Sequence, residues 1–191
     1  MDRLYYRLAT LVLAVALLLP CSVRAQIVNG DFEAGGTGWT VSVPPGWTGS
    51  FPPAGGNPNG FGQIMSPFGN SGGEGCLRQQ FLCGEGAPAS FCRITLDYLL
   101  HNVDASSLSG RVVVMIDNVQ KFVSPPADDI GWTSISFSVP CGTHEIELCL
   151  QVDAGNNGWR AGFDNVKAFC ETNVGVDNRT WGGVKALYLQ P

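Results

Sequence analysis

Residues 132–139 read Trp-Thr-Ser-Ile-Ser-Phe-Ser-Val, and this stretch decides the fold class. Its apolar side chains Ile135, Phe137 and Val139 alternate with serines, which is the period of a β-strand that buries one face. Residues 144–152 repeat the pattern, with isoleucine, leucine and valine alternating with more polar side chains. Both stretches predict strands of a sheet that packs one face on a core and turns the other to solvent.

Further strand-like stretches lie on both sides of this pair. They are residues 39–43, 61–65, 77–82, 91–100, 111–116, 120–123 and 161–169. Clusters of Gly, Pro, Asn and Ser separate them, and no long helix is expected before residue 180. Eight or so short strands at this spacing predict an all-β fold, an antiparallel β-sandwich.

The composition agrees with this fold class. The 191 residues include 25 Gly and 12 Pro, 45% are hydrophobic and 14% are charged. So few charges exclude long amphipathic helices rich in Glu and Lys, and the apolar content argues against disorder. The net charge of −5 argues against a nucleic-acid partner, which calls for a basic surface.

The first 25 residues have the pattern of a secretory signal peptide. Arg3 and Arg7 precede an uncharged apolar run at 8–19, and small residues end at Ala25. The run is shorter than the ~20 apolar residues of a membrane-spanning helix. A lipoprotein attached through Cys21 is the alternative. We expect cleavage near Ala25 and a mature chain that is secreted, periplasmic or on the cell surface, without a membrane span.

Cleavage there divides the chain into three parts. Residues 1–25 are the signal peptide, 26–170 the sandwich, and 171–191 a polar linker with a short apolar tail whose role the sequence leaves open. Removing the signal peptide leaves 8 basic and 15 acidic residues, a net charge of −7. This charge disfavours anionic ligands.

Six cysteines remain in the mature chain, and an even number in an exported protein predicts three disulfides. Six cysteines allow 15 pairings. Hairpin geometry favours Cys83–Cys92 across a loop and Cys141–Cys170 between the last strands, which leaves Cys76–Cys149 by elimination. Zinc is the alternative, but the chain has no Cys-x-x-Cys spacing and two histidines.

Two motifs at the ends of the expected sandwich resemble a known family. Residues 28–33, Val-Asn-Gly-Asp-Phe-Glu, with Gly38-Trp39 after them, resemble the opening of family 4/9/22 carbohydrate-binding modules. Residues 162–166, Gly-Phe-Asp-Asn-Val, resemble the last strand of the same galactose-binding-like group. The resemblance spans about residues 27–169. It implies a jelly roll of two sheets, an extracellular setting and, in many members, a structural calcium ion.

The residues also suit calcium, which takes six to eight hard oxygen ligands. Glu33 ends the first expected strand and Asp164 lies on the last, so their carboxylates converge if these strands are neighbours. By the resemblance, Glu33 and Asp164 are the side-chain ligands and Asp31 contributes its carbonyl. Glu74 is a further candidate. The alternative is that Glu33 caps a turn and Asp164 faces solvent.

Sugar binding on a sandwich uses exposed aromatic rings with polar neighbours. Trp47 and Trp159 stand in loops, and Arg160 follows the second, so these are the best candidates to face a ligand. Tyr98 is a weaker candidate. The alternative is that both indole rings cover the ends of the sandwich. Trp39 and Trp132 resemble core positions of the family.

Catalytic patterns are weak in this sequence. A glycosidase needs two facing carboxylates, and Glu145 and Glu147 share one side of a strand, as on any polar strand face. We therefore expect a domain that binds, with a glycan or cell-surface polymer as partner, rather than an enzyme. A structural or adhesive surface domain without glycan specificity is the alternative. Exposed tryptophans would favour the first function, and buried ones the second.

Overall fold

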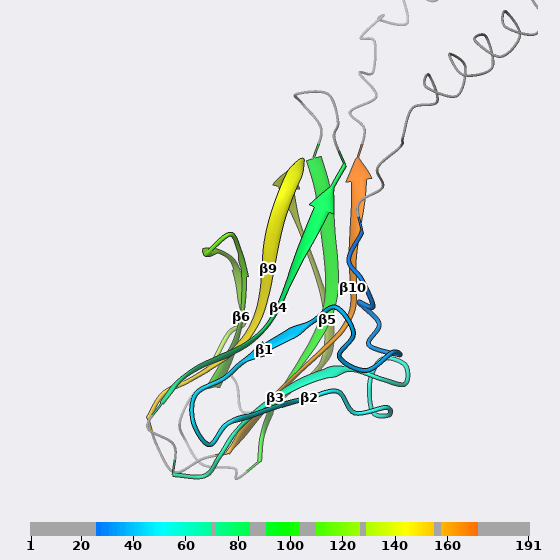
Figure 1. The fold of residues 1–191 in the computed structure, drawn as a ribbon. Coiled ribbons are helices and arrows are strands. Elements are labelled where there is room, and N and C mark those ends of the chain that lie inside the picture. Colours follow the sequence, from blue (N-terminus) through cyan, green and yellow to red (C-terminus); the bar gives the residue numbers. More distant parts are fainter. Residues whose placement is uncertain are drawn as a thin grey trace, which may run out of the picture.

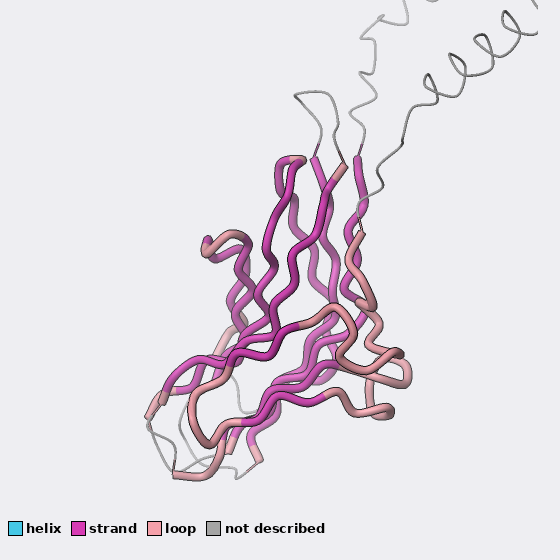
Figure 2. Tube along the Cα trace, viewed as in Figure 1, coloured by secondary structure: helices cyan, strands magenta, loops and turns pink. Residues whose placement is uncertain are grey.

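The computed structural model describes residues 26–69, 72–84, 91–103, 110–126, 129–154 and 158–171, which form ten strands in two antiparallel sheets (Figure 1). The first sheet has the order β1-β4-β9-β6-β7 and the second β2-β3-β10-β5-β8. The strands are β1 (Thr40–Ser42), β2 (Thr48–Ser50), β3 (Gly62–Ser66), β4 (Gly73–Cys83), β5 (Phe91–Asn102), β6 (Gly110–Ile116), β7 (Val119–Val123), β8 (Asp129–Pro140), β9 (Gly142–Val152) and β10 (Trp159–Glu171). These ranges contain strands and loops but no helix (Figure 2).

The core lies between the two sheets, because each strand turns alternate apolar side chains inward. In the first sheet Leu148 of β9 stands between Leu77 of β4 and Val114 of β6, and all three are fully buried. In the second sheet Phe163 of β10 pairs with Tyr98 of β5, and both are buried. The predicted sandwich is therefore confirmed.

The strand pattern that decided the fold class is also confirmed. On β8, Val139 is buried and Ile135 and Phe137 are half-buried, while the serines between them are exposed. Two local predictions were wrong. The structure adds β2, which is too short and glycine-containing to show a period. Glu33 does not end a strand, because residues 28–38 form turns.

Two of the three predicted disulfides are present, Cys76–Cys149 and Cys83–Cys92. The first joins residues that face each other on β4 and β9. The predicted Cys141–Cys170 bond stays a prediction, because the side chain of Cys170 lies outside the described residues. The same holds for the signal peptide and for the tail after residue 171. No helix in the described ranges has the length and apolar character needed to cross a membrane.

Candidate binding face and carboxylate cluster

The outer side of the first sheet carries a continuous band of polar side chains. Because alternate residues of a strand share one side, the paired strands β4 and β9 present facing couples on it. These couples are Glu74 with Gln151, Cys76 with Cys149, Arg78 with Glu147 and Gln80 with Glu145. β6 adds Arg111 beside Gln151, and β1 adds Thr40 beside Arg78. We call this side of the sheet the polar face.

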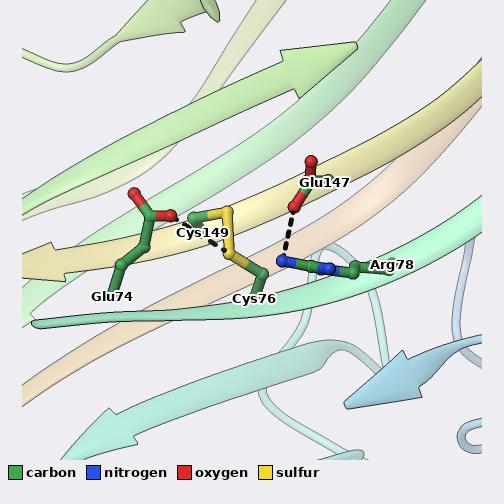
Figure 3. The surroundings of a disulfide bond; sticks show 5 residues. All are labelled: Glu74, Cys76, Arg78, Glu147 and Cys149. Carbon is green, nitrogen blue, oxygen red and sulfur yellow. Dashed lines mark hydrogen bonds and ion pairs between the residues drawn. A yellow bond between two sulfur atoms is a disulfide. The ribbon is translucent and has the colours of Figure 1, made fainter. Parts of the chain in front are cut away.

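An ion pair and a disulfide hold the middle of the polar face (Figure 3). Arg78 Nη2 lies 2.9 Å from Glu147 Oε2, and the Arg78 side chain is 40% exposed whereas that of Glu147 is 1% exposed. The neighbouring Cys76–Cys149 bond is buried against Val113. The glutamate is therefore covered by its own ion pair, and it accepts no hydrogen bond from the described residues at Oε1.

The charged neighbours of Glu74 on the polar face shift its pKa. Burial raises the pKa of the Glu74 carboxyl, and the negative charge of Glu147 raises it further, while Arg78 lowers it. One arginine thus offsets the charge of two neighbouring glutamates. The centre of the polar face therefore carries two carboxylates and one guanidinium.

Two hollows lie on this face, at either end of the disulfide along the strands. The first has a volume of about 380 Å³ and is lined by Gly38, Thr40, Arg78, Gln79, Gln80 and Glu145. The second has a volume of about 430 Å³ and is lined by Gly73, Glu74, Arg111, Gln151, Val152 and Asp153. Both are lined mostly by amide, carboxylate, hydroxyl and guanidinium groups, which can exchange hydrogen bonds with a hydroxylated ligand.

The aromatic residues predicted to face a ligand do not lie on the surface. Trp47, Trp159 and Tyr98 are 6%, 0% and 3% exposed, so none of these rings can stack on a sugar, and this prediction was wrong. The Trp159 ring occupies the space that a side chain at Gly110 would fill. The rings turn inward because glycines on strands of the opposite sheet leave room for them. Arg160 is half-buried on β10, and no ligand role for it is tested.

The two predicted core tryptophans have different outcomes. Trp39 is buried, and its Nε1 donates to the Asn29 carbonyl at 3.1 Å, as expected of a core indole. Trp132 is half-buried but is not among the residues that form or pack against the core, so its prediction as core was wrong. Its Nε1 donates to the Gly55 carbonyl at 3.3 Å, and its ring meets Phe61 edge-on with centroids 5.8 Å apart.

A second cluster of charge lies on the outer side of the second sheet, under the loop of residues 55–60. Asp164 is 1% exposed, and its Oδ2 accepts a hydrogen bond from the Asn57 backbone N–H at 2.6 Å. Asp97 Oδ2 accepts from the Asn57 side chain at 3.2 Å. Glu33 Oε1 accepts from the Gly60 N–H at 3.2 Å. One loop therefore ties together carboxylates from the N-terminal turns, β5 and β10.

Electrostatics at Asp164 suit a cation. Burial raises the pKa of its carboxyl, hydrogen bonds from Asn57 and Asn165 lower it, and the charges of Asp97 and Glu33 raise it again. The hydrogen bonds just described come from neutral donors, so they leave three negative charges in proximity. A divalent cation would offset this repulsion.

The three predicted calcium ligands are not equally placed for that role. Glu33 and Asp164 both accept hydrogen bonds from the 55–60 loop, whereas the Asp31 side chain is exposed and its Oδ1 accepts from the Glu33 N–H at 3.4 Å. Only the Asp31 carbonyl would thus be available to a cation. The convergence of the Glu33 and Asp164 carboxylates on one ion stays a prediction. The ligand oxygens do not form a tight cage, because within the described ranges only cysteine-containing groups bring three ligand atoms within 4.8 Å of one another. The predicted alternative ligand Glu74 lies on the other sheet.

Sequence reasoning missed the partners that complete both sites. Arg78 and Glu147 meet because β4 pairs with β9 in one register, and Asp97 meets Asn57 through a loop closed over β5. Long-range register of this kind leaves no local signal in the sequence. For Glu147, a charged residue between the apolar positions of a strand was the only hint.

Comparison with known proteins identifies the fold. No protein-family model matches the chain, and neither does any curated protein sequence. Among solved structures, the K3 cleaved adhesin domain of Lys-gingipain from Porphyromonas gingivalis w83 is similar over 79% of this chain and 99% of that one, with 14% identity and a TM-score of 0.56. A family 28 carbohydrate-binding module specific for non-crystalline cellulose is similar over 75% and 94%, with 12% identity and a TM-score of 0.51. These likenesses confirm the predicted jelly-roll β-sandwich.

Proposed function

We propose that this chain is a secreted, non-catalytic domain that binds a neutral glycan on the polar face. The observation that carries the proposal is the pair of polar hollows on either side of the disulfide-braced centre of that face. The fold is one that carbohydrate-binding modules also have. Two disulfides support export, because such bonds form in oxidising compartments.

The chemistry of the face suits hydroxyl groups. The amides of Gln80 and Gln151 can donate and accept, Glu145 can accept, and Arg111 can donate. The ion pair and the disulfide hold the strands beneath these side chains, so little ordering is needed when a ligand binds. Recognition would rest on hydrogen bonds along the face rather than on ring stacking.

The same geometry supports a binding role over hydrolysis. Glycoside hydrolysis needs two carboxyl groups that both reach the substrate. Glu147 is buried in its ion pair with Arg78. Glu145 faces the first hollow, but the next carboxylate on the same side of β9 is Glu147, which is not free to reach a substrate. We expect no turnover in a glycoside hydrolase screen.

Removing polar side chains from the first hollow should weaken glycan binding. We expect the wild-type mature chain to bind at least one class of neutral glycan on an array, and Gln80→Ala/Glu145→Ala to lose about tenfold or more in affinity, because each lost hydrogen bond to a ligand removes about 1 kcal/mol. The matched control is Ser136→Ala/Ser138→Ala, two exposed positions on the outer side of the other sheet. Equal binding by both double variants would contradict this site.

A structural or adhesive surface domain without glycan specificity is the second candidate. The burial of Trp47 and Trp159 favours this function. The lack of aromatic rings on the polar face favours it too, because strand alternation places none there among the described residues. The array distinguishes the two functions. A folded wild-type chain that binds no glycan would leave the adhesive function.

We further propose that Glu33 and Asp164 hold a structural calcium ion beneath the 55–60 loop. Binding at a hundredfold excess over Kd stabilises by about 2.7 kcal/mol, so we expect a chelator to lower the Tm by on the order of 5–10 °C. Glu33→Gln should remove this shift, whereas Glu145→Gln on the polar face should keep it. A Tm that is the same in calcium and in chelator would refute the proposal.

A further inference from the structure

Three sulfur atoms meet at one end of the sandwich. Cys83 ends β4, Cys92 is the second residue of β5, and Cys141 lies between β8 and β9. Their Sγ atoms all lie within 4.8 Å of one another. This is the end of the molecule where β4 and β10 end and β5 begins, at the top of Figure 1.

The central sulfur has two partners within reach. Cys83 is bonded to Cys92, and its Sγ lies 3.9 Å from the Sγ of Cys141. Within the described residues Cys141 has no disulfide partner. A thiol in contact with a disulfide is the arrangement from which thiol–disulfide exchange proceeds.

The three cysteines differ in how exposed they are to a reagent in solution. Cys83 and Cys92 are each 0% exposed, while Cys141 is half-buried. A thiol or disulfide from solution therefore meets Cys141 first.

The turn that carries Cys141 is built to hold it in place. His144 Nε2 lies 2.8 Å from the Pro140 carbonyl oxygen, and Nδ1 lies 2.7 Å from Asp117 Oδ2. Gly142 has a φ of 148°, a conformation that favours glycine, and its backbone faces Cys83 in the β4–β9 register. These contacts fix Cys141 against Cys83 instead of leaving it on a free loop.

We propose that Cys83, Cys92 and Cys141 form an intramolecular exchange site in which Cys83 alternates between two partners. The Cys141 thiolate attacks Cys83 Sγ, the Cys83–Cys141 bond forms, the Cys83–Cys92 bond breaks, and Cys92 leaves as a thiolate that takes up the proton released by Cys141. One thiol and one disulfide stand on each side of the step, so no oxidant or reductant is consumed.

The leaving sulfur has a further partner nearby. The backbone of Cys92 faces that of Cys170 in the β5–β10 register. Exchange would therefore convert a bond across the 84–91 loop into one between β4 and the β8–β9 turn, and would free Cys92 beside the strand that carries Cys170. The disulfide pairing at this end of the sandwich would change, while the two β-sheets would stay as they are.

The test is disulfide mapping of the mature chain after incubation at pH 8 with a low concentration of glutathione, followed by acid quenching, alkylation and mass spectrometry. We expect cross-linked peptides for both Cys83–Cys92 and Cys83–Cys141, in amounts within about tenfold of each other because both bonds are intramolecular. Cys76–Cys149 should remain fully bonded. Cys83 linked to Cys92 alone, or Cys141 linked to Cys170 as the sequence predicts, would overturn the proposal.

Two variants give an independent readout. Cys92→Ser should contain Cys83–Cys141 in place of the lost bond, with an unchanged β-sheet circular dichroism spectrum, and Cys141→Ser is the matched control that should retain only Cys83–Cys92. Alkylation of Cys83 in a folded Cys92→Ser chain would overturn the proposal as well. If this variant fails to fold, the mapping of the wild-type chain decides.

Discussion

Replacing Gly30 by alanine is expected to lower the free energy of unfolding by about 3 kcal/mol. A Cβ at Gly30 would lie 1.9 Å from the Val166 carbonyl oxygen and 2.9 Å from its carbon, and backbone atoms of β10 cannot move aside as a flexible side chain can. The Gly30 carbonyl also accepts the Val166 N–H at 2.8 Å, which ties the N-terminal turns to β10. The substitution would break this connection.

Urea unfolding followed by tryptophan fluorescence measures this effect, with Gly131→Ala as the matched control. A Cβ at Gly131 meets nothing within 4 Å, so we expect a change of no more than about 0.5 kcal/mol there. Because Glu33 follows the same turn, Gly30→Ala should also weaken the proposed calcium effect on Tm. A Gly30→Ala chain as stable as Gly131→Ala would show that the turn does not pack on β10 as described.

Replacing Arg78 by methionine is expected to cost about 2 kcal/mol, because it leaves the carboxylate of Glu147 buried without its partner. The expected cost is below the ~3–5 kcal/mol of a fully buried pair, since Arg78 is 40% exposed and water can enter its place. Methionine keeps the apolar stem of the side chain and removes the charge. Glu147→Leu should cost less, because the freed guanidinium can turn to solvent.

The double variant Arg78→Met/Glu147→Leu separates charge from packing. Replacing a buried ion pair by apolar side chains is often neutral, so we expect the double variant to recover to within about 1 kcal/mol of wild type. Chemical denaturation of the four proteins gives the coupling energy of the pair. If Arg78→Met alone has no effect on stability, Glu147 is not buried as the structure shows.

The parts of the fold that follow from local pattern were predictable from sequence. The alternation of Ile135, Phe137 and Val139 with serines specifies which side of β8 faces inward. The spacing of Cys83 and Cys92 matches a loop between consecutive strands, although β4 and β5 lie in different sheets and do not form the expected hairpin. The Gly162–Val166 motif placed Asp164 beside the N-terminal turns through its resemblance to the family. In each case the information lies within a few consecutive residues.

The orientation of the tryptophans and the proposed binding face could not be predicted in the same way. Trp47 and Trp159 stand beside glycine-rich loops in which apolar and polar residues do not alternate regularly. The sequence pattern therefore does not indicate whether their rings face the core or the solvent. Gly75 and Gly110, on other strands, provide the space that these rings fill. The Arg78–Glu147 pair likewise depends on the register between β4 and β9. Both features come from contacts between segments far apart in the chain.

The position of β10 has a consequence for how the chain folds during synthesis. β10 is the last strand of the described residues, yet it lies in the middle of the second sheet, between β3 and β5. Until residues 159–171 have emerged from the ribosome, β2 and β3 have no hydrogen-bonded connection to β5 and β8. The second sheet can therefore be completed only after β10 has been translated.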